Sequence, residues 1–297
     1  AAKDLKADAK VGDVLEIPLE VPGDFGRMAA QTAKQVIIQK LREAERNVVF
    51  DDFKTQENHI VQGIVQRRDR NGTVIIDLGK IIGFLPAAEQ IYREQYRPGM
   101  RLRLYVLSVA MGARGPEIIL SRATNKMVEE VFVSEIPEIA DGAVVVKGIA
   151  RDPGNRSKVA VATDEASIDP IGSCIGQRGS RITTIIDELG GEKIDMIQYS
   201  ADPAAYIKEA LNPAKVSYVE LDEQTKEATA HVAADQFSLA IGRGGQNVRL
   251  AATLTGWKIK IVQQGEEEKA VTSEDDADAL AKALEDKKDG EETAEKA

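Results

Sequence analysis

Two short segments carry glycine and arginine in a spacing that suits phosphate binding. Residues 176–179 read GQRG and residues 242–245 read GRGG, so each segment begins and ends with glycine. Without a side chain at either glycine, the anionic backbone of a nucleic acid can lie directly against the protein backbone. A helix that starts after each segment would turn its unpaired N–H groups and its positive dipole end to the same phosphates. We therefore predict two phosphate-binding loops.

The two loops occupy the same place in a duplicated domain. CIGQRGSRI from Cys174 and AIGRGGQNV from Ala240 align at a constant offset of 66 residues, which also pairs Gly190 with Gly256. Apolar periodicity predicts the order helix, strand, strand, helix, Gly-x-x-Gly, helix, strand in each copy. This is the order of the bacterial, or type II, KH domain. The expected helices cover 127–135 and 204–211, and the expected strands cover 144–149, 158–162, 192–197, 216–221, 228–232 and 257–262.

The loops and the groove behind them supply the candidate contacts to single-stranded RNA. Small and apolar side chains are expected to line the groove, and polar side chains beside the loops are expected to reach base edges. In the first copy the candidates are Cys174, Ile175, Gly176, Gln177, Arg178, Gly179, Ser180, Arg181 and Ile182. In the second copy they are Ala240, Ile241, Gly242, Arg243, Gly244, Gly245, Gln246, Asn247 and Val248.

Two other interpretations of the glycines are weaker. One Gly-x-x-Gly alone often marks only a turn or a helix end, and the duplication is what favours a binding site. The second segment also half resembles the dinucleotide-binding pattern Gly-x-Gly-x-x-Gly. That pattern requires a preceding strand and a glycine or alanine at the position of Asn247, whereas a helix is predicted to precede the segment.

A small β domain is predicted upstream of the duplicated domains. Residues 59–122 alternate short apolar strands with turns, and Asn71-Gly72 is a strong hairpin signal. Five such strands favour an OB barrel of the S1 type. Its cations and rings can contact single-stranded RNA, although tyrosines near turns commonly complete a small core instead. The side chains in question are Arg67, Arg68, Arg70, Phe84, Tyr92, Tyr96 and Tyr105.

The two ends of the chain give different signals. Apolar residues recur at three- and four-residue steps over 27–49, which predicts a long amphipathic helix that buries one face. Residues 10–20 are expected to form a strand of a domain whose beginning is missing, because a lone strand and helix cannot close a core. Residues 266–297 hold 13 Asp and Glu against five Lys. We predict that they form a disordered acidic tail with at most a frayed helix near 276–284.

The tail accounts for most of the acidic net charge. The whole chain carries a formal charge of -10, and the tail contributes 5 − 13 = −8, which leaves about −2 for residues 1–265. Contact with phosphates depends on local Lys and Arg rather than on the whole-chain charge. A nearly neutral body is therefore compatible with an RNA partner.

The sequence contains no constellation typical of catalysis or metal binding. His59 and His231 lie in separate predicted domains with no Cys or His nearby, so we expect no metal and no cofactor. Cys174 is the single cysteine, which excludes an intramolecular disulfide and indicates a reducing, cytoplasmic compartment. No apolar segment approaches the roughly 20 residues of a membrane span. We expect a monomer that is not an enzyme and does not contact a membrane.

Several long strings are specific enough to carry a family resemblance: AAQTAKQVIIQKLREAER from Ala29, YRPGMRLRLYVLSV and IILSR in the barrel, ARDPGNRSKVAVATD from Ala150, DPIGSCIGQRGSRI from Asp169 and SLAIGRGGQNVRLAATLTGW from Ser238. Through them the chain resembles the bacterial NusA family of transcription termination/antitermination factors over residues 10–262. The resemblance implies that the partners are nascent single-stranded RNA, RNA polymerase and other elongation factors. It adds Arg249 to the RNA contacts, with Arg151 and Lys158 as secondary candidates beside Arg67, Arg68 and Phe84.

The expected organisation is a multidomain α+β protein in five parts. These are the remnant of an N-terminal polymerase-binding domain with its connecting helix (1–54), the S1-type barrel (55–123), two KH domains (124–202 and 203–265) and the tail (266–297). The resemblance implies that most of the polymerase-binding head precedes Ala1, which would weaken or abolish polymerase binding. Two alternatives stay open: an RNA-binding module of an RNA-processing or degradation assembly, and a structural scaffold that binds no RNA.

Overall fold

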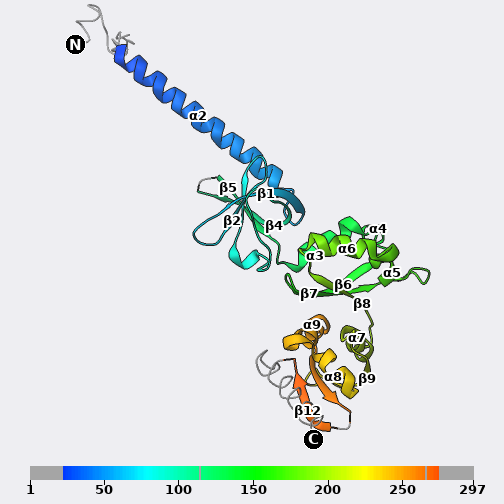
Figure 1. The fold of residues 1–297 in the computed structure, drawn as a ribbon. Helices are drawn as coiled ribbons and strands as arrows, with labels where there is room; N and C mark the ends of the chain where they lie inside the picture. The colour runs from blue at the N-terminus through cyan, green and yellow to red at the C-terminus, as the bar shows by residue number, and fades with distance from the viewer. Residues whose placement is uncertain (1–22, 114, 265, 274–297) are drawn as a thin grey trace, which may run out of the picture.

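The protein forms a long helix, a small barrel and two α/β domains that follow one another along the chain. The computed structural model describes residues 23–113, 115–264 and 266–273, and Figure 1 shows these units in order from the N-terminal helix. The multidomain α+β architecture predicted from the sequence is confirmed. The expected strand at 10–20 and the expected frayed helix near 276–284 lie outside the described residues.

The connecting helix is α2, Gly23–Lys54, and its apolar side chains are exposed along most of its length. Met28, Ile37 and Leu41 are 64%, 66% and 59% exposed. The helix meets the barrel through its C-terminal turns, where Phe53 is buried in the barrel core. The predicted burial of one face is therefore wrong for the described residues, because periodicity reveals an apolar stripe but not a surface that covers it.

The barrel has five strands, as predicted, and it is closed. The strands follow one another in the order β1-β2-β3-β5-β4 around the barrel. Gly72, in the turn between the first two strands, has a φ of 83°, which glycine adopts without strain. The strands are β1 Ile60–Arg68, β2 Val74–Asp77, β3 Ile82–Leu85, β4 Arg101–Gly112 and β5 Gly115–Ser121, with the short helix η1 Ala87–Glu89 after β3.

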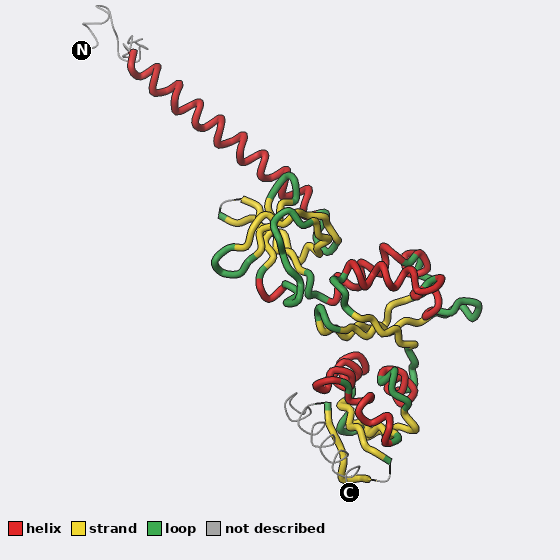
Figure 2. The backbone as a smooth tube through the Cα atoms, in the orientation of Figure 1, coloured by secondary structure: helices red, strands yellow, loops and turns green. Residues whose placement is uncertain are grey.

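The first KH domain packs its helices on one face of a three-stranded sheet (Figure 2). Strand β7 lies in the middle, antiparallel to β6 and parallel to β8. Val131, Val159 and Ile185 are fully buried between the helices and the sheet. The elements are α3 Asn125–Glu135, α4 Pro137–Ala140, β6 Val145–Asp152, β7 Arg156–Ala162, α5 Pro170–Ile175, η2 Gln177–Gly179, α6 Ser180–Glu188 and β8 Lys193–Gln198.

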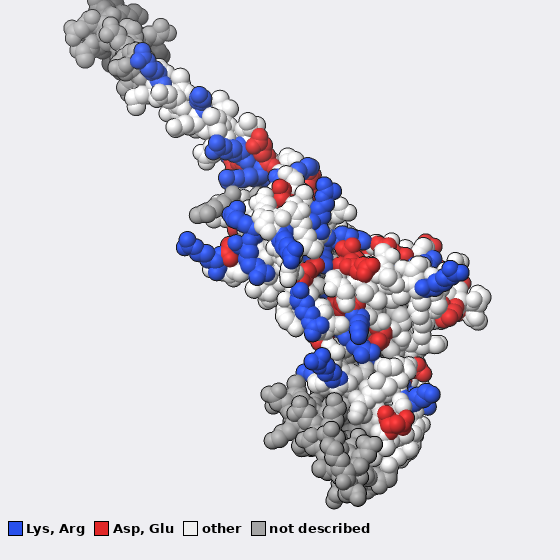
Figure 3. All heavy atoms as spheres, in the orientation of Figure 1, with Lys and Arg blue, Asp and Glu red and all other residues white. Residues whose placement is uncertain are grey.

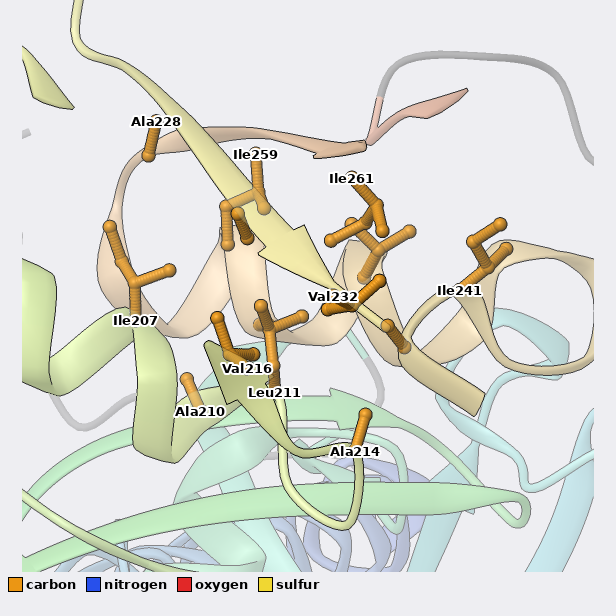
Figure 4. Close-up of a cluster of buried hydrophobic side chains, with 14 of the residues drawn as sticks. Ile207, Ala210, Leu211, Ala214, Val216, Ala228, Val232, Ile241, Ile259 and Ile261 are labelled. Atoms are coloured by element: carbon orange, nitrogen blue, oxygen red, sulfur yellow. The ribbon is translucent and has the colours of Figure 1, made fainter. Parts of the chain in front are cut away.

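The second KH domain repeats this order. Figure 4 shows its core, where Ile207 of the leading helix and Leu211, directly after that helix, meet Ile259 and Ile261 from the sheet. Strand β10 lies antiparallel to β9 and parallel to β11. The elements are α7 Pro203–Ala210, β9 Val216–Asp222, β10 Glu227–Val232, α8 Ala234–Ile241, η3 Arg243–Gly245, α9 Gln246–Thr255 and β11 Lys258–Gln263.

The second sheet has a fourth strand that the sequence analysis missed. Strand β12, Glu266–Thr272, pairs antiparallel with β11, although the tail was predicted to be disordered from residue 266. Val271 is 9% exposed and belongs to the domain core. The acidic composition hides this strand, because an edge strand requires only backbone hydrogen bonds and a buried apolar side chain. Residues 274–297 lie outside the described part of the chain.

The second KH domain covers the sheet face of the first that its own helices leave open. Figures 1 and 2 show α7 and α9 on this side of the sheet, and Ala160, Ile197 and Tyr206 form a buried cluster there with Leu254 packed against it. A Cβ at Gly148 would lie 3.3 Å from Leu254 Cδ1, so a glycine lets the two surfaces come close. Packing against the sheet thus sets the relative orientation of the two domains.

A buried arginine of the barrel forms an ion pair within the barrel and a hydrogen bond to the first KH domain. Arg122 Nε lies 2.7 Å from Glu94 Oε2, and the two side chains are 1% and 8% exposed. Arg122 also donates to the carbonyl of Glu188, at the C-terminal end of α6, over 2.9 Å. Separation of the two domains would take one acceptor away from this buried guanidinium, which is costly. The barrel and both KH domains therefore form a connected series of packed units.

Replacing Val271 with alanine tests whether β12 belongs to the second domain. We expect the Val271→Ala variant to lower the unfolding free energy of this domain by about 1–2 kcal/mol, because apolar surface is lost from the core. Trp257 is the single tryptophan of the chain and lies in this domain, so its fluorescence in a urea titration measures the effect. An unchanged midpoint would mean that the strand does not contribute to the fold.

Candidate nucleic-acid interface

The two Gly-x-x-Gly loops have the same backbone conformation. The φ and ψ angles are 73° and 176° at Gly176 and 76° and 174° at Gly242. The third loop position is left-handed in both copies, with φ of 53° at Arg178 and 57° at Gly244. Positions 66 residues apart therefore have equivalent geometry, as the duplication predicts.

The first glycine of each loop is required by packing as well as by its backbone. A Cβ at Gly176 would lie 2.8 Å from Arg181 Cγ, and a Cβ at Gly242 would lie 2.7 Å from Asn247 Cβ. Both glycines also have positive φ, which L side chains rarely adopt. The inner side of each loop is thus filled by the residue five positions later, and the outer side is where a ligand can approach.

Each loop leads directly into a helix whose N-terminus lacks a side-chain cap. The N-cap residues of α6 and α9 are Gly179 and Gly245, and neither offers a side-chain acceptor to the first-turn N–H groups. Uncapped N–H groups together with the positive end of the helix dipole attract anions. Arg178 and Arg243 are exposed beside them and add a cation to each loop.

Arg178 is a non-glycine residue in the left-handed region. Its φ and ψ are 53° and 26°, a conformation that costs an L side chain roughly 1 kcal/mol. At the equivalent position of the second loop the residue is Gly244, which adopts the same conformation without that cost. The first loop therefore keeps an exposed guanidinium where stability alone favours glycine, which points to a role in binding.

Arg181 and Asn247 were expected to read base edges, but they hold the loops in place. Asn247 is 2% exposed, and its amide donates to three helix-end carbonyls, including that of Leu239 at 3.3 Å. Arg181 donates to the carbonyl of Ser173 at 2.7 Å, and its charge is paired with Glu138 at 2.8 Å. Ser173 and Leu239 are themselves 66 residues apart, so both side chains make the same contact beneath their loops.

Several residues expected to line the apolar groove belong instead to the domain cores. Cys174 and Ala240 are fully buried, as is Val248, and Ile241 is 1% exposed. Burial also raises the pKa of the Cys174 thiol to about 12, so the thiol stays protonated. Ile175 is 36% exposed, so its contact with a base stays a prediction.

One apolar surface residue beside the second loop was missed. Leu239 is 44% exposed near the C-terminal end of α8. The repeat pairs it with Ser173, which is polar, so alignment of the two copies gave no signal for it. A helical projection of 234–241 would have placed it opposite Phe237 and Ile241, which are buried.

The polar candidates separate into surface and interface residues. Gln177, Ser180 and Arg249 are exposed, and Arg249 donates to the carbonyl of Gly244 within the second loop at 2.6 Å. Gln246 is half-buried, and its side-chain amide donates to Asp152 Oδ2 of the first KH domain at 2.6 Å. Gln246 thus links the start of α9 to the β6–β7 hairpin of the neighbouring domain.

Arg151 and Lys158 are corrected from RNA candidates to buried structural residues. The Arg151 side chain is 0% exposed, 3.0 Å from Glu192, whose side chain is also 0% exposed. Lys158 is likewise 0% exposed, and its Nζ donates to the carbonyl of Asn212 in the second KH domain at 2.7 Å. An ammonium or guanidinium without solvent access cannot displace counterions from RNA.

The barrel candidates also divide by burial. Tyr96 and Tyr105 are 9% and 2% exposed, and they complete the cores of the barrel and of the first KH domain. Phe84 is half-buried on β3. Tyr92 is 75% exposed, which makes it the ring of this group that is free to stack on a base. Arg67, Arg68 and Arg70 are exposed.

Figure 3 shows lysine and arginine side chains over the barrel and along its junction with the KH domains on the face in view. In the described parts of the chain, no group of three or more His, Cys, Asp and Glu side chains is arranged to hold a metal ion. No described helix combines the length and the apolar character needed to cross a membrane.

A closed S1-type barrel followed by two KH domains with equivalent glycine loops defines a multidomain RNA-binding protein. Family models agree with the geometry: the S1 RNA binding domain matches residues 54–122, the NusA-like first KH domain 122–199, the NusA-like second KH domain 203–269 and the NusA N-terminal domain 1–47. The chain belongs to the NusA family of transcription termination/antitermination proteins.

Three relatives illustrate how similar the chain is to this family. The transcription termination/antitermination protein NusA of Halalkalibacterium halodurans is 46% identical over 93% of this chain and 72% of its own length. NusA of Thermus thermophilus is 46% identical over 85% and 65%, and NusA of Bacillus subtilis is 47% identical over 88% and 70%. The chain thus spans 65% to 72% of the length of these relatives.

Replacing Asn247 with alanine removes the support of the second loop. We expect a loss of about 2–3 kcal/mol of unfolding free energy in the second KH domain, because three helix-end carbonyls, two of them in buried hydrogen bonds, lose their donor. Urea titration followed by Trp257 fluorescence measures the loss. Gln224→Ala, at an exposed amide of the same domain, is the matched control and should be close to neutral. Equal stability of the two variants would contradict the supporting role.

The buried ammonium of Lys158 makes stability depend on pH. Burial lowers the pKa of Lys158 to about 8 from an ordinary value of 10.5. Between these pH values the unfolded chain binds the proton and the folded chain does not, so stability rises with pH from about 8 to about 10.5. We expect a rise of about 3 kcal/mol, measured by urea titrations across this window. Lys158→Met should abolish the rise, and its persistence in that variant would assign it to another group.

Proposed function

We propose that the chain binds single-stranded nascent RNA through both KH loops and the barrel, and thereby modulates pausing, termination and antitermination by RNA polymerase. The observation that carries the proposal is the pair of equivalent loops. Each loop combines a bare glycine backbone, an uncapped helix N-terminus and an exposed arginine. These three features converge on a phosphate, and their repetition suits a ligand that is itself a chain of phosphates.

The RNA contacts within the proposal are the surface residues of the two loops. They are Ile175, Gly176, Gln177, Arg178, Gly179 and Ser180 in the first KH domain and Leu239, Gly242, Arg243, Gly244 and Arg249 in the second, where Gly245 is buried. Phosphates would lie against the glycines and helix ends, while Ile175 and Leu239 would pack against bases. Arg67, Arg68 and Phe84 of the barrel are secondary contacts.

The protein partners in the proposal are RNA polymerase and other elongation factors. Support comes from the match of the NusA N-terminal domain to residues 1–47 and from the names of the relatives, which are termination/antitermination proteins. Those names favour transcription over RNA processing or degradation. A factor of this kind would act as a monomer on transcribing polymerase in the bacterial cytoplasm, without catalysis of its own.

Charge reversal in the loops tests RNA binding. The variant carries Gln177→Asp, Arg178→Asp, Arg243→Asp and Gly244→Asp, which place carboxylates where phosphates would lie. We expect its affinity for single-stranded RNA to fall at least about 100-fold and the salt dependence to flatten, because phosphate contacts are lost. The affinity is measured by fluorescence anisotropy across a range of salt concentrations.

A variant with the same total charge change controls for bulk electrostatics. Arg27→Asp, Lys34→Asp and Lys40→Asp on the exposed helix α2 should leave RNA affinity within about threefold of the parent, since charges beyond a Debye length are screened. Arg178→Gly is the mildest loop change. A glycine at position 178 adopts the conformation of Gly244 without strain. We therefore expect an unchanged unfolding free energy and a lower RNA affinity. Equal RNA affinity in the loop and helix variants would falsify the site assignment.

A further inference from the structure

The loop between β3 and β4 presents an aromatic ring to solvent between two residues whose side chains are buried. The Tyr92 side chain is 75% exposed, while Ile91 before it is 1% exposed and Tyr96 after it is 9% exposed. The guanidinium of Arg93 lies over the Tyr92 ring, 5.6 Å from its centroid, and its Nε donates to the Tyr92 hydroxyl at 3.0 Å. An aromatic ring and a guanidinium plane thus stand together at the surface.

Hydrogen bonds hold the backbone of the loop on both sides of this pair. The backbone N–H of Ile91 donates to the Tyr96 hydroxyl at 2.9 Å, and the N–H of Glu94 donates to the Ile91 carbonyl at 3.0 Å. The Glu94 carboxylate is fixed in turn by the buried ion pair with Arg122. A single exposed apolar residue needs no explanation on its own. Here the backbone beside the ring is already held, so less backbone entropy is lost when a ligand binds.

The charges around Tyr92 favour an anionic ligand. The acidic side chains of this region point inward, since Glu89 bonds to Ser121 and Glu94 pairs with Arg122. The exposed charges are Arg93 and Arg97 from the same loop. Bases of single-stranded RNA stack on aromatic rings and arginine planes while phosphates meet cations, so this surface matches both parts of that ligand.

A single hairpin connects this surface to the second KH loop. The turn between β6 and β7 lies so close to the barrel that any side chain at Gly154 would overlap Ile91. On the same hairpin, Asp152 accepts the hydrogen bond from Gln246, which directly follows the second Gly-x-x-Gly. Residues 152 and 154 are at most about 7 Å apart, because two residues of extended chain span no more.

The first KH loop lies farther from the barrel along its own helix. The barrel contacts the C-terminal end of α6 through Arg122 and Glu188, whereas the first loop precedes the N-terminal end at Ser180. A nine-residue helix is about 13 Å long. The second loop, although later in the sequence, is therefore the one that the hairpin contacts link to the loop carrying Tyr92.

We propose that Tyr92 and Arg93 form a third RNA contact that stacks a nucleobase, and that RNA runs from this contact across the 152–156 hairpin to the second KH loop. This inference rests on the proposed function, since it extends the same RNA ligand. It sets an order of contacts in space, barrel to second KH loop, that differs from the order of domains in the sequence.

Two lengths of random-sequence RNA separate the third contact from the KH loops. About eight nucleotides suffice for two KH loops at about four each, and about 20 nucleotides add the length that an OB barrel takes. Tyr92→Ala should lower the affinity for the 20-mer about tenfold, as measured by fluorescence anisotropy. The affinity for the 8-mer should stay within about twofold of the parent. Tyr92→Trp should retain the 20-mer affinity, because it keeps the ring. Tyr218→Ala, at a 49% exposed tyrosine on the second KH sheet, is the matched control and should change neither.

The path is tested by combining substitutions. In an Arg243→Glu background, in which the second loop binds RNA more weakly, Tyr92→Ala should lower the affinity for the 20-mer less than about twofold, because the RNA no longer reaches the barrel along the hairpin. In an Arg178→Glu background, Tyr92→Ala should still lower this affinity about tenfold. A Tyr92 effect that survives in the Arg243 background, or disappears in the Arg178 background, overturns the path.

The two RNA lengths distinguish loss of the Tyr92 contact from loss of binding at the KH loops. Unchanged 20-mer affinity in Tyr92→Ala, or an equal loss for both RNA lengths, overturns the third contact. The 8-mer affinity of the loop charge-reversal variant is independent of Tyr92, and it alone decides whether the KH loops bind RNA.

Discussion

The packing of α7 and α9 on the open face of the first KH sheet is the interaction on which the arrangement of the binding surfaces depends. A three-stranded sheet with helices on one side leaves its other face bare, and the second KH domain fills that face with Tyr206 and Leu254. Apolar contact is not directional, so polar contacts select one arrangement. Lys158 donates to the carbonyl of Asn212, and Gln246 donates to Asp152. Both KH loops are consequently positioned before any ligand arrives, which lowers the entropy lost on binding.

Buried charge makes the β6–β7 hairpin rigid at the point where the three domains approach one another. Glu192 is fully buried and accepts hydrogen bonds from Arg151, from the hydroxyl of Ser157 and from the backbone N–H of Gly154 at 2.8 Å. Such a site costs desolvation energy, and its value lies in the single geometry that satisfies every donor. The hairpin can therefore transmit the position of the barrel to the start of α9.

Much of the fold was predictable because the sequence repeats. An offset of 66 residues revealed two copies of one domain, and the structure places Gly176 and Gly242 in the same conformation. The barrel followed from alternating apolar residues and the Asn71-Gly72 turn. The helix face over 27–49 and strand β12 were not predicted correctly, since periodicity and composition describe a segment without naming what it packs against.

The candidate site was predictable at the glycines and less so at the side chains around them. Arg181 and Asn247 have the polar chemistry of base-reading residues, but tertiary contacts turn them beneath the loops. Arg151 and Lys158 belong to a hairpin whose polar sequence suggests exposure, but Arg151 pairs with Glu192 of its own domain and Lys158 donates to Asn212 of the next. The exposure of Tyr92 and the burial of Tyr96 differ because only one of them faces the barrel core, a distinction that residue type does not carry.

Helix α2 has a mechanical consequence. Its 32 residues extend about 48 Å, and Phe53 anchors only the end at the barrel. The helix therefore acts as a lever arm about that anchor. A rotation of about 10° at Phe53 would displace Gly23 by about 8 Å for this length. A small change in how the last turns pack on the barrel thus becomes a large displacement at the N-terminal end of the helix.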